Sequence, residues 1–224
     1  MKLHAFLPST RVLGIMALKA HLGLDFDVQR LDLSQGGQRM PDYLAKNPNS
    51  KMPMLEEAAF ALWESNAILV YLAAQSPQSG LWPSDLARQA DVLRWLFWQS
   101  AHWDAESWGM VVFEKASKAV LGLGPPDAAF IARGEQNFAR FAAVLDQSLS
   151  GRTWLTGEAL TVADFSVGAI LPSAARIGLS VDPYPQIGLW YARLAALPSW
   201  QFALAQQAAA MAAWQVERQA RDGN

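Results

Sequence analysis

The spacing of apolar residues changes several times along the first third of the chain. Residues 2–7 have strand character, and residues 11–23 then place apolar side chains at helical spacing up to a glycine. Residues 25–33 return to the alternation of a strand. This order predicts a strand, helix, strand unit at the start of the chain.

The following pattern divides the chain into two parts. Residues 35–48 predict a loop with a weak helix, residues 51–64 two short strands, and residues 65–75 a helix. Residues 76–85 are rich in proline, serine and glycine, as linkers commonly are, and every later periodic stretch has helical spacing. We therefore expect a mixed α/β domain over 1–76, a linker over 77–85 and an all-helical domain over 86–224.

Composition narrows the class of protein. Of the 224 residues, 52% are hydrophobic and 17% charged, and the net charge of −2 gives no basic footprint for nucleic acid. No apolar run approaches the roughly 18 residues of a spanning helix, and Arg11 and Lys19 interrupt the first apolar stretch too early for a signal peptide. We expect a soluble cytoplasmic protein with no nucleic-acid or membrane partner.

The absence of cysteine and the scarcity of histidine limit the reactions that this chain can catalyse with its own side chains. It has no cysteine and only three widely spaced histidines, which removes thiol nucleophiles and gives little support to a metal site. Any reaction must use hydroxyl groups, backbone dipoles, carboxylates or a ligand's own reactive group.

Three motifs occur in order along the chain: NPNSKMPML at 47–55, WESNAILVYLA at 63–73 and LTVADFSVGAIL at 160–171. Together with the two-part organisation, they resemble the cytosolic glutathione transferase family in its bacterial, serine-type or theta, phi and beta-like classes. The resemblance implies a thioredoxin-like α/β N-terminal domain, an all-α C-terminal domain, glutathione as co-substrate without a metal, and a homodimer.

The first motif contains Met52 and Pro53, at the start of an expected strand. Only about 5–6% of X-Pro bonds in folded proteins are cis, so the sequence by itself favours a trans bond and an edge proline. The family resemblance instead implies a cis bond that turns the Met52 backbone towards a peptide-like ligand. It also implies that Arg39 and Lys51 meet the glycyl carboxylate of glutathione, although exposed basic residues are commonly just solvated.

The other two motifs combine folding signals with an implied role. Ser65 is a natural N-cap for the helix that follows it, and a helix N-terminus attracts carboxylates. The resemblance implies that Glu64 meets the amino group and Ser65 the carboxylate of the γ-glutamyl end. In the third motif, Thr161 and Asp164 form a capping box, for which we expect a structural role only.

The turn between the first strand and the first helix carries Ser9 and Thr10. The thiol of glutathione has a solution pKa near ~8.5, and a hydroxyl donor at a helix N-terminus lowers it. Serine-type relatives place such a hydroxyl a few residues before an arginine similar to Arg11, although their serine falls earlier than Ser9 does. Ser9 is the first candidate and Thr10 the second. Alternatively, both only cap the helix while a backbone amide holds the sulfur.

The electrophile should bind in a cleft between the first turn and the long helix after the linker. Pro8, Trp103 and Trp108 are candidates for its wall, although aromatic residues at helical spacing are more often core. The resemblance implies conjugation of the glutathione thiolate to small apolar electrophiles. Two alternatives remain: a glutathione-dependent disulfide reductase or peroxidase, and a non-enzymatic binding protein of the same fold.

Overall fold

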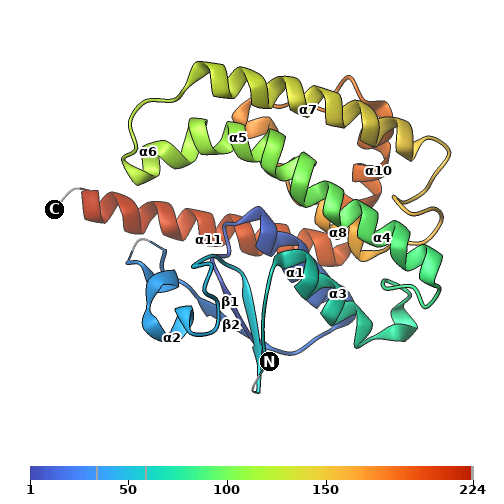
Figure 1. Ribbon diagram of the computed structural model, residues 1–224, viewed down its shortest axis with the longest axis horizontal. Coiled ribbons are helices and arrows are strands. Elements are labelled where there is room, and N and C mark those ends of the chain that lie inside the picture. Colours follow the sequence, from blue (N-terminus) through green and yellow to red (C-terminus); the bar gives the residue numbers. More distant parts are fainter. Residues whose placement is uncertain (34, 59, 223–224) are drawn as a thin grey trace. The chain divides into compact units, whose positions relative to one another are not determined.

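The computed structural model describes residues 1–33, 35–58 and 60–222 (Figure 1). The chain forms two compact units. The first consists of Met1–Ser79 together with Ala196–Asn224, and the second of Gly80–Ala195. Within the described residues, no helix combines the length and the apolar character needed to cross a membrane.

A four-stranded mixed sheet forms the centre of the first unit. Its strands are β1 (Lys2–Ala5), β2 (Asp27–Arg30), β3 (Met54–Glu57) and β4 (Phe60–Trp63), in the order β2-β1-β3-β4. β1 pairs with β2 in parallel and with β3 antiparallel, and β3 pairs antiparallel with β4. The predicted strand, helix, strand unit and the two later strands are thus confirmed, as is the thioredoxin-like α/β class.

Helices lie between these strands and after the last of them. They are α1 (Thr10–Leu22), η1 (Gly37–Arg39), α2 (Pro41–Leu44), α3 (Ser65–Ala74) and η2 (Pro77–Ser79). α1 packs against α3. Ser9 caps the start of α1, and Gly23 ends it with a left-handed φ of 63° that a residue with a side chain seldom adopts. Helix α1 is mostly apolar and buried from Val12 to Leu18, so it forms much of the core of this unit.

The last long helix, α11 (Pro198–Asp222), belongs to the first unit and packs along α1 (Figure 1). The boundaries expected from the sequence place this helix in the second domain, whereas its contacts group it with the first unit. The difference arises because a domain boundary inferred from the sequence can only divide the chain into consecutive segments. The unit to which a helix belongs depends on its packing contacts, which for α11 are with α1.

The second unit is helical, as predicted, apart from an isolated bridge between Trp154 and Gly157. The long stretch after the linker is broken into α4 (Leu86–Trp98), the π-helical η3 (Gln99–Trp108), α5 (Gly109–Val112), the π-helical η4 (Phe113–Ser117) and α6 (Lys118–Leu121). It is followed by α7 (Ala128–Leu149), α8 (Val162–Gly168), α9 (Leu171–Ala174), η5 (Ala175–Ile177) and α10 (Pro185–Ala195).

The start of α8 lies in the core of this unit. Thr161 and Asp164 form the expected capping box, and the Asp164 carboxylate is fully buried. Besides the Thr161 amide, it accepts hydrogen bonds from the Leu155 amide at 2.9 Å and from the Trp190 indole at 2.8 Å. Burial raises the pKa of Asp164, and the hydrogen bonds oppose that shift. The third motif therefore ties the start of α8 to two other segments of the unit.

Candidate functional site

The register of the sheet brings four chain segments to one edge. Ala5 pairs with Arg30 at the carboxyl ends of β1 and β2, and Met54, the first residue of β3, pairs with Trp63 at the carboxyl end of β4. Because His4 pairs with Met54, these ends all lie at the same edge. The segments that leave this edge carry nine of the predicted site residues: Pro8, Ser9, Thr10, Arg39, Lys51, Met52, Pro53, Glu64 and Ser65.

Ser9 lies in the turn after β1 and caps α1. Its backbone is extended, and its Oγ accepts the N–H of Arg11 at 3.3 Å. Because the oxygen is the acceptor in this bond, the hydroxyl proton is available to donate to another group. The first turn of α1 contains no acidic residue, so its own side chains do not neutralise the positive end of the helix dipole. Thr10 is the first helical residue and is 7% exposed.

The segment before β3, which carries Lys51 and Met52, accepts hydrogen bonds from two buried side chains. The carbonyl of Lys51 accepts hydrogen bonds from Tyr43 Oη at 2.5 Å and Asn47 Nδ2 at 2.7 Å. Burial raises the pKa of Tyr43, so its hydroxyl remains a donor at neutral pH. The bond between Met52 and Pro53 is cis, as the family resemblance implies. The two hydrogen bonds to the Lys51 carbonyl therefore fix the backbone directly before Met52.

The connection from β4 to α3 has an unusual backbone. Glu64 has φ 73° and ψ 116°, a combination that residues with a side chain rarely adopt and that costs about 1–3 kcal/mol. Such strain gathers at ligand sites. Glu64 is the N-cap, and its side chain makes no capping hydrogen bond. The prediction that Ser65 is the N-cap is therefore wrong by one residue: the bend falls at Glu64, so Ser65 already belongs to the helix.

The predicted basic residues are solvent-exposed. Arg39 ends η1 and Lys51 precedes Met52, and both side chains are exposed. The guanidinium of Arg39 and the ammonium of Lys51 make no ion pair or hydrogen bond within the described part of the chain. Their contact with a carboxylate stays a prediction.

The residues predicted to line an electrophile site are buried within their own units. Trp103 is 0% exposed, stacks on Phe138 with ring centroids 4.6 Å apart, and donates to the Val167 carbonyl at 3.2 Å. These contacts make Trp103 a core residue. Trp108 is 9% exposed and donates to Ser173 Oγ at 2.9 Å.

Comparison with known families agrees with this arrangement. Residues 1–74 match the model described as "Glutathione S-transferase, N-terminal domain", and residues 110–198 match "Glutathione S-transferase, C-terminal domain". The chain belongs to the glutathione S-transferase family.

Individual relatives cover most of the chain. Glutathione S-transferase GstB of Escherichia coli (strain K12) is 31% identical over 200 residues, which is 85% of this chain and 91% of that protein. The disulfide-bond oxidoreductase YfcG of the same strain is 30% identical over 184 residues, 79% of this chain and 81% of that protein. The theta class enzyme of Xanthomonas axonopodis pv. citri, solved with glutathione bound, is 26% identical, with a TM-score of 0.80 over 90% of this chain and 95% of that one.

The sequence patterns assign no role to some of the residues that support this edge of the sheet. Tyr43 lies in a segment predicted only as loop and weak helix, and Asn47 opens the first motif without a role being assigned to its side chain. Gln207 donates to the Pro8 carbonyl and Trp214 contacts Phe6, both from α11. No local pattern predicts contacts between residues about 200 positions apart.

Proposed function

We propose that this member of the glutathione S-transferase family binds glutathione at the shared sheet edge and adds its sulfur to small apolar electrophiles, with the Ser9 hydroxyl holding the thiolate. The observation that carries the proposal is the geometry of Ser9 Oγ, which accepts the Arg11 amide at the start of α1. That bond leaves the hydroxyl proton for the sulfur and polarises the O–H group.

The chemical task is to ionise a thiol. A thiol with a pKa near ~8.5 is only a few per cent thiolate at neutral pH, and lowering that pKa by one unit requires about 1.36 kcal/mol of preferential interaction with the thiolate. One charge-assisted hydrogen bond together with a helix N-terminus supplies this amount. The thiol proton leaves to solvent, and the sulfur electron pair forms the new bond to the electrophilic carbon while the bond to the leaving group breaks; with an aryl halide, halide ion is released.

The remaining groups at the edge fit the rest of the tripeptide. The backbone of Met52 pairs with the peptide of glutathione, and the exposed Arg39 and Lys51 meet its glycyl carboxylate. Glu64 meets the amino group, while Ser65 and the amides at the start of α3 receive the γ-glutamyl carboxylate. The strained backbone of Glu64 supports this assignment, because strain of this kind is retained where it positions a ligand.

A second candidate reaction is glutathione-dependent disulfide reduction. The similarity to YfcG, a disulfide-bond oxidoreductase, favours it. Since this chain contains no cysteine, such a reaction would use two glutathione molecules: one thiolate attacks the disulfide, and a second resolves the mixed disulfide to oxidised glutathione.

We also propose that the protein is a homodimer. Leu86, Leu93 and Phe97 follow one face of α4 and are 80%, 37% and 71% exposed. Large apolar side chains that are exposed along one helix face are typical of subunit interfaces. Light scattering should therefore give twice the chain mass, and Phe97→Asp should reduce it.

The activity is tested by pH profiles of conjugation to an activated aryl halide. Ser9→Ala and Ser9→Gly should lower kcat/KM about tenfold at neutral pH, and the deficit should shrink as the pH rises past ~8.5, where the thiol ionises unaided. Ser9→Thr should keep most activity because it keeps the hydroxyl group. Ser9→Gly separates capping from catalysis, since a glycine N-cap costs only a few tenths of a kcal/mol.

The results for these variants distinguish a role of Ser9 in activating the thiol from the other possibilities. Equal activity of Ser9→Ala and Ser9→Thr, or a deficit that does not depend on pH, would remove Ser9 from the mechanism. Thr10→Ala tests the second hydroxyl in the same assay. A wild type that reduces a small disulfide with glutathione but conjugates no aryl halide would establish the second candidate reaction.

A further inference from the structure

The turn that carries Ser9 is closed by its own backbone. The N–H of Ser9 donates to the carbonyl of Phe6 at 2.9 Å, and Pro8 between them has a ring-restricted φ. The N–H of Ser9 and the carbonyl of Pro8 belong to the same planar peptide unit. The orientation of that peptide plane, together with the φ of −70° at Ser9, sets where the Cα–Cβ bond of Ser9 points.

The other polar atom of this peptide is bonded from the far end of the chain. Gln207 on α11 is 7% exposed, and its Nε2 donates to the Pro8 carbonyl at 3.2 Å. Both polar atoms of the peptide between Pro8 and Ser9 are thus engaged, one by the turn and one by α11. A peptide unit held at both atoms cannot rotate about its flanking bonds without breaking a hydrogen bond.

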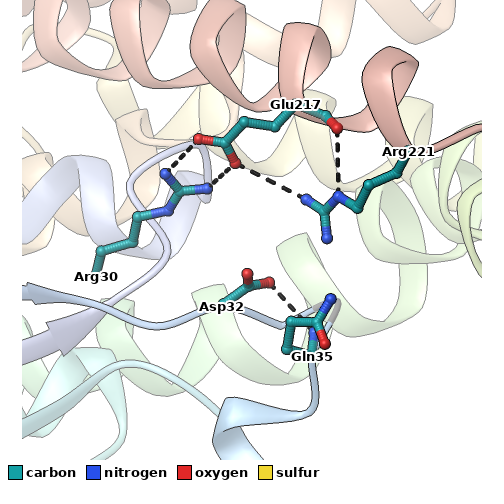
Figure 2. Close-up of polar contacts among 5 residues, drawn as sticks. All are labelled: Arg30, Asp32, Gln35, Glu217 and Arg221. Atoms are coloured by element: carbon teal, nitrogen blue, oxygen red, sulfur yellow. Dashed lines mark hydrogen bonds and ion pairs between the residues drawn. The ribbon is translucent and has the colours of Figure 1, made fainter. Parts of the chain in front are cut away.

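Two further contacts hold α11 at the same edge of the sheet. Trp214 lies seven residues after Gln207, on the same helix face, and its ring meets Phe6 edge-on with centroids 5.9 Å apart. Glu217 forms a two-pronged ion pair with Arg30, the last residue of β2. Figure 2 shows the Glu217 carboxylate directed at the Arg30 guanidinium, with Arg221 on its other side.

We propose that Gln207 is a positioning residue for thiol activation, and that α11, held by Trp214 and Glu217, sets the direction of the Ser9 hydroxyl. The proposal rests on the function proposed above. A hydrogen bond to a thiolate depends on distance and angle, and a displacement of about 1 Å in a positioned group can cost about 100-fold in rate. Loss of the Gln207 bond frees the Pro8 carbonyl and with it the backbone on which Ser9 stands.

The first variant is Gln207→Met, which preserves most of the side-chain volume and removes the donor. The ultraviolet thiolate absorbance of bound glutathione, titrated with pH, should show the thiol pKa rising by about one unit, with kcat at neutral pH falling in proportion to the thiolate fraction, at most about tenfold. The KM for glutathione should change little, because Gln207 touches none of the groups assigned to the tripeptide.

The matched control is Ser199→Ala. Ser199 is also buried on α11 and bonds to α1, at its opposite end, through His21 Nδ1 at 3.3 Å. Both substitutions remove one side-chain hydrogen bond that joins α11 to residues 8–21. Ser199→Ala should lower thermal stability to a similar degree and leave the thiol pKa at the wild-type value. An equal rise of the thiol pKa in both variants would overturn the proposal, since general loosening of α11 would then explain it.

A double-mutant cycle tests whether Gln207 acts through Ser9. If it does, Gln207→Met should raise the thiol pKa in the wild type and hardly at all in Ser9→Ala. The same rise in both backgrounds, or no rise in either, contradicts the positioning role. Should Gln207→Met not fold, Gln207→Asn withdraws the amide from Pro8 by one methylene and carries the same expectation.

Failure of the proposed function has a different signature. In that case the wild type itself leaves the thiol of bound glutathione at its solution pKa, and the positioning proposal falls with it. A lowered thiol pKa in the wild type that Gln207→Met does not change overturns the positioning role and leaves the proposed function standing.

Discussion

Replacing Asp164 with alanine removes a fully buried carboxylate and four hydrogen bonds from the second unit. Three of them leave a buried N–H without its acceptor: the amides of Leu155 and Thr161 and the indole of Trp190. The fourth is the weaker contact from the Thr161 hydroxyl at 3.2 Å. An unsatisfied buried donor costs about 1–3 kcal/mol, so three give roughly 3–9 kcal/mol before compensation.

Removal of the carboxylate also ends the cost of burying it, which offsets part of that sum. We therefore expect Asp164→Ala to lower the free energy of unfolding by about 4 kcal/mol, within the range that marks a disrupted buried network. Asp164→Asn retains the oxygen that serves Leu155 and Trp190 but places an amide nitrogen against the Thr161 N–H. Its expected loss is about 1–2 kcal/mol.

The assay is urea unfolding followed by tryptophan fluorescence at neutral pH. The control is Asp85→Ala, which removes a solvent-exposed N-cap with one hydrogen bond, to the Arg88 amide at 3.0 Å. Its expected loss is about 1 kcal/mol. The account of Asp164 would be refuted if alanine and asparagine destabilised equally, or if Asp164→Ala cost no more than Asp85→Ala.

Three further predictions concern other parts of the chain. Tyr43→Phe removes one of the two hydrogen-bond donors to the Lys51 carbonyl. Calorimetry should show glutathione binding weakened about fivefold. An unchanged affinity for glutathione would contradict a role for this hydrogen bond. The lowered pKa of Glu217 means that its ion pair stabilises above the ordinary value of 4.5 and is lost as pH falls through the folded value. The Tm advantage of wild type over Glu217→Gln should therefore vanish in acid, and a difference that persists there would refute this sign. Gly134→Ala should cost about 1–3 kcal/mol, because its Cβ would lie 2.7 Å from a valine methyl, whereas Gly188→Ala on α10, with open space, should be neutral or stabilising by calorimetry.

Much of the fold follows from local sequence patterns. The helical spacing of Phe138, Phe141 and Leu145 predicts the buried face of α7, and all three are buried. The long stretch after the linker shows where such patterns fail. At Gly109, where one π-helical segment ends, a Cβ would lie 2.7 Å from the carbonyl oxygen of Asp104, five residues earlier in the same helical stretch. Periodicity carries no record of such a close approach.

In the candidate site, too, some features are predictable from local sequence patterns and others are not. The glutathione-binding positions that we propose follow from the family resemblance of the ordered motifs at 47–55 and 63–73. The bend at Glu64 is set by the junction of β4 and α3, so capping preference misplaces the helix start by one residue. The contact of Gln207 with Pro8 depends on where α11 packs, and no spacing in the sequence encodes it.

The ultraviolet spectrum of glutathione bound to the wild-type protein, titrated with pH, tests the central claim most directly. If the Ser9 hydroxyl holds the sulfur at the start of α1, thiolate absorbance should appear at neutral pH and titrate well below ~8.5. Bound glutathione that ionises only at its solution pKa would contradict the account, and would leave Ser9 as a helix cap.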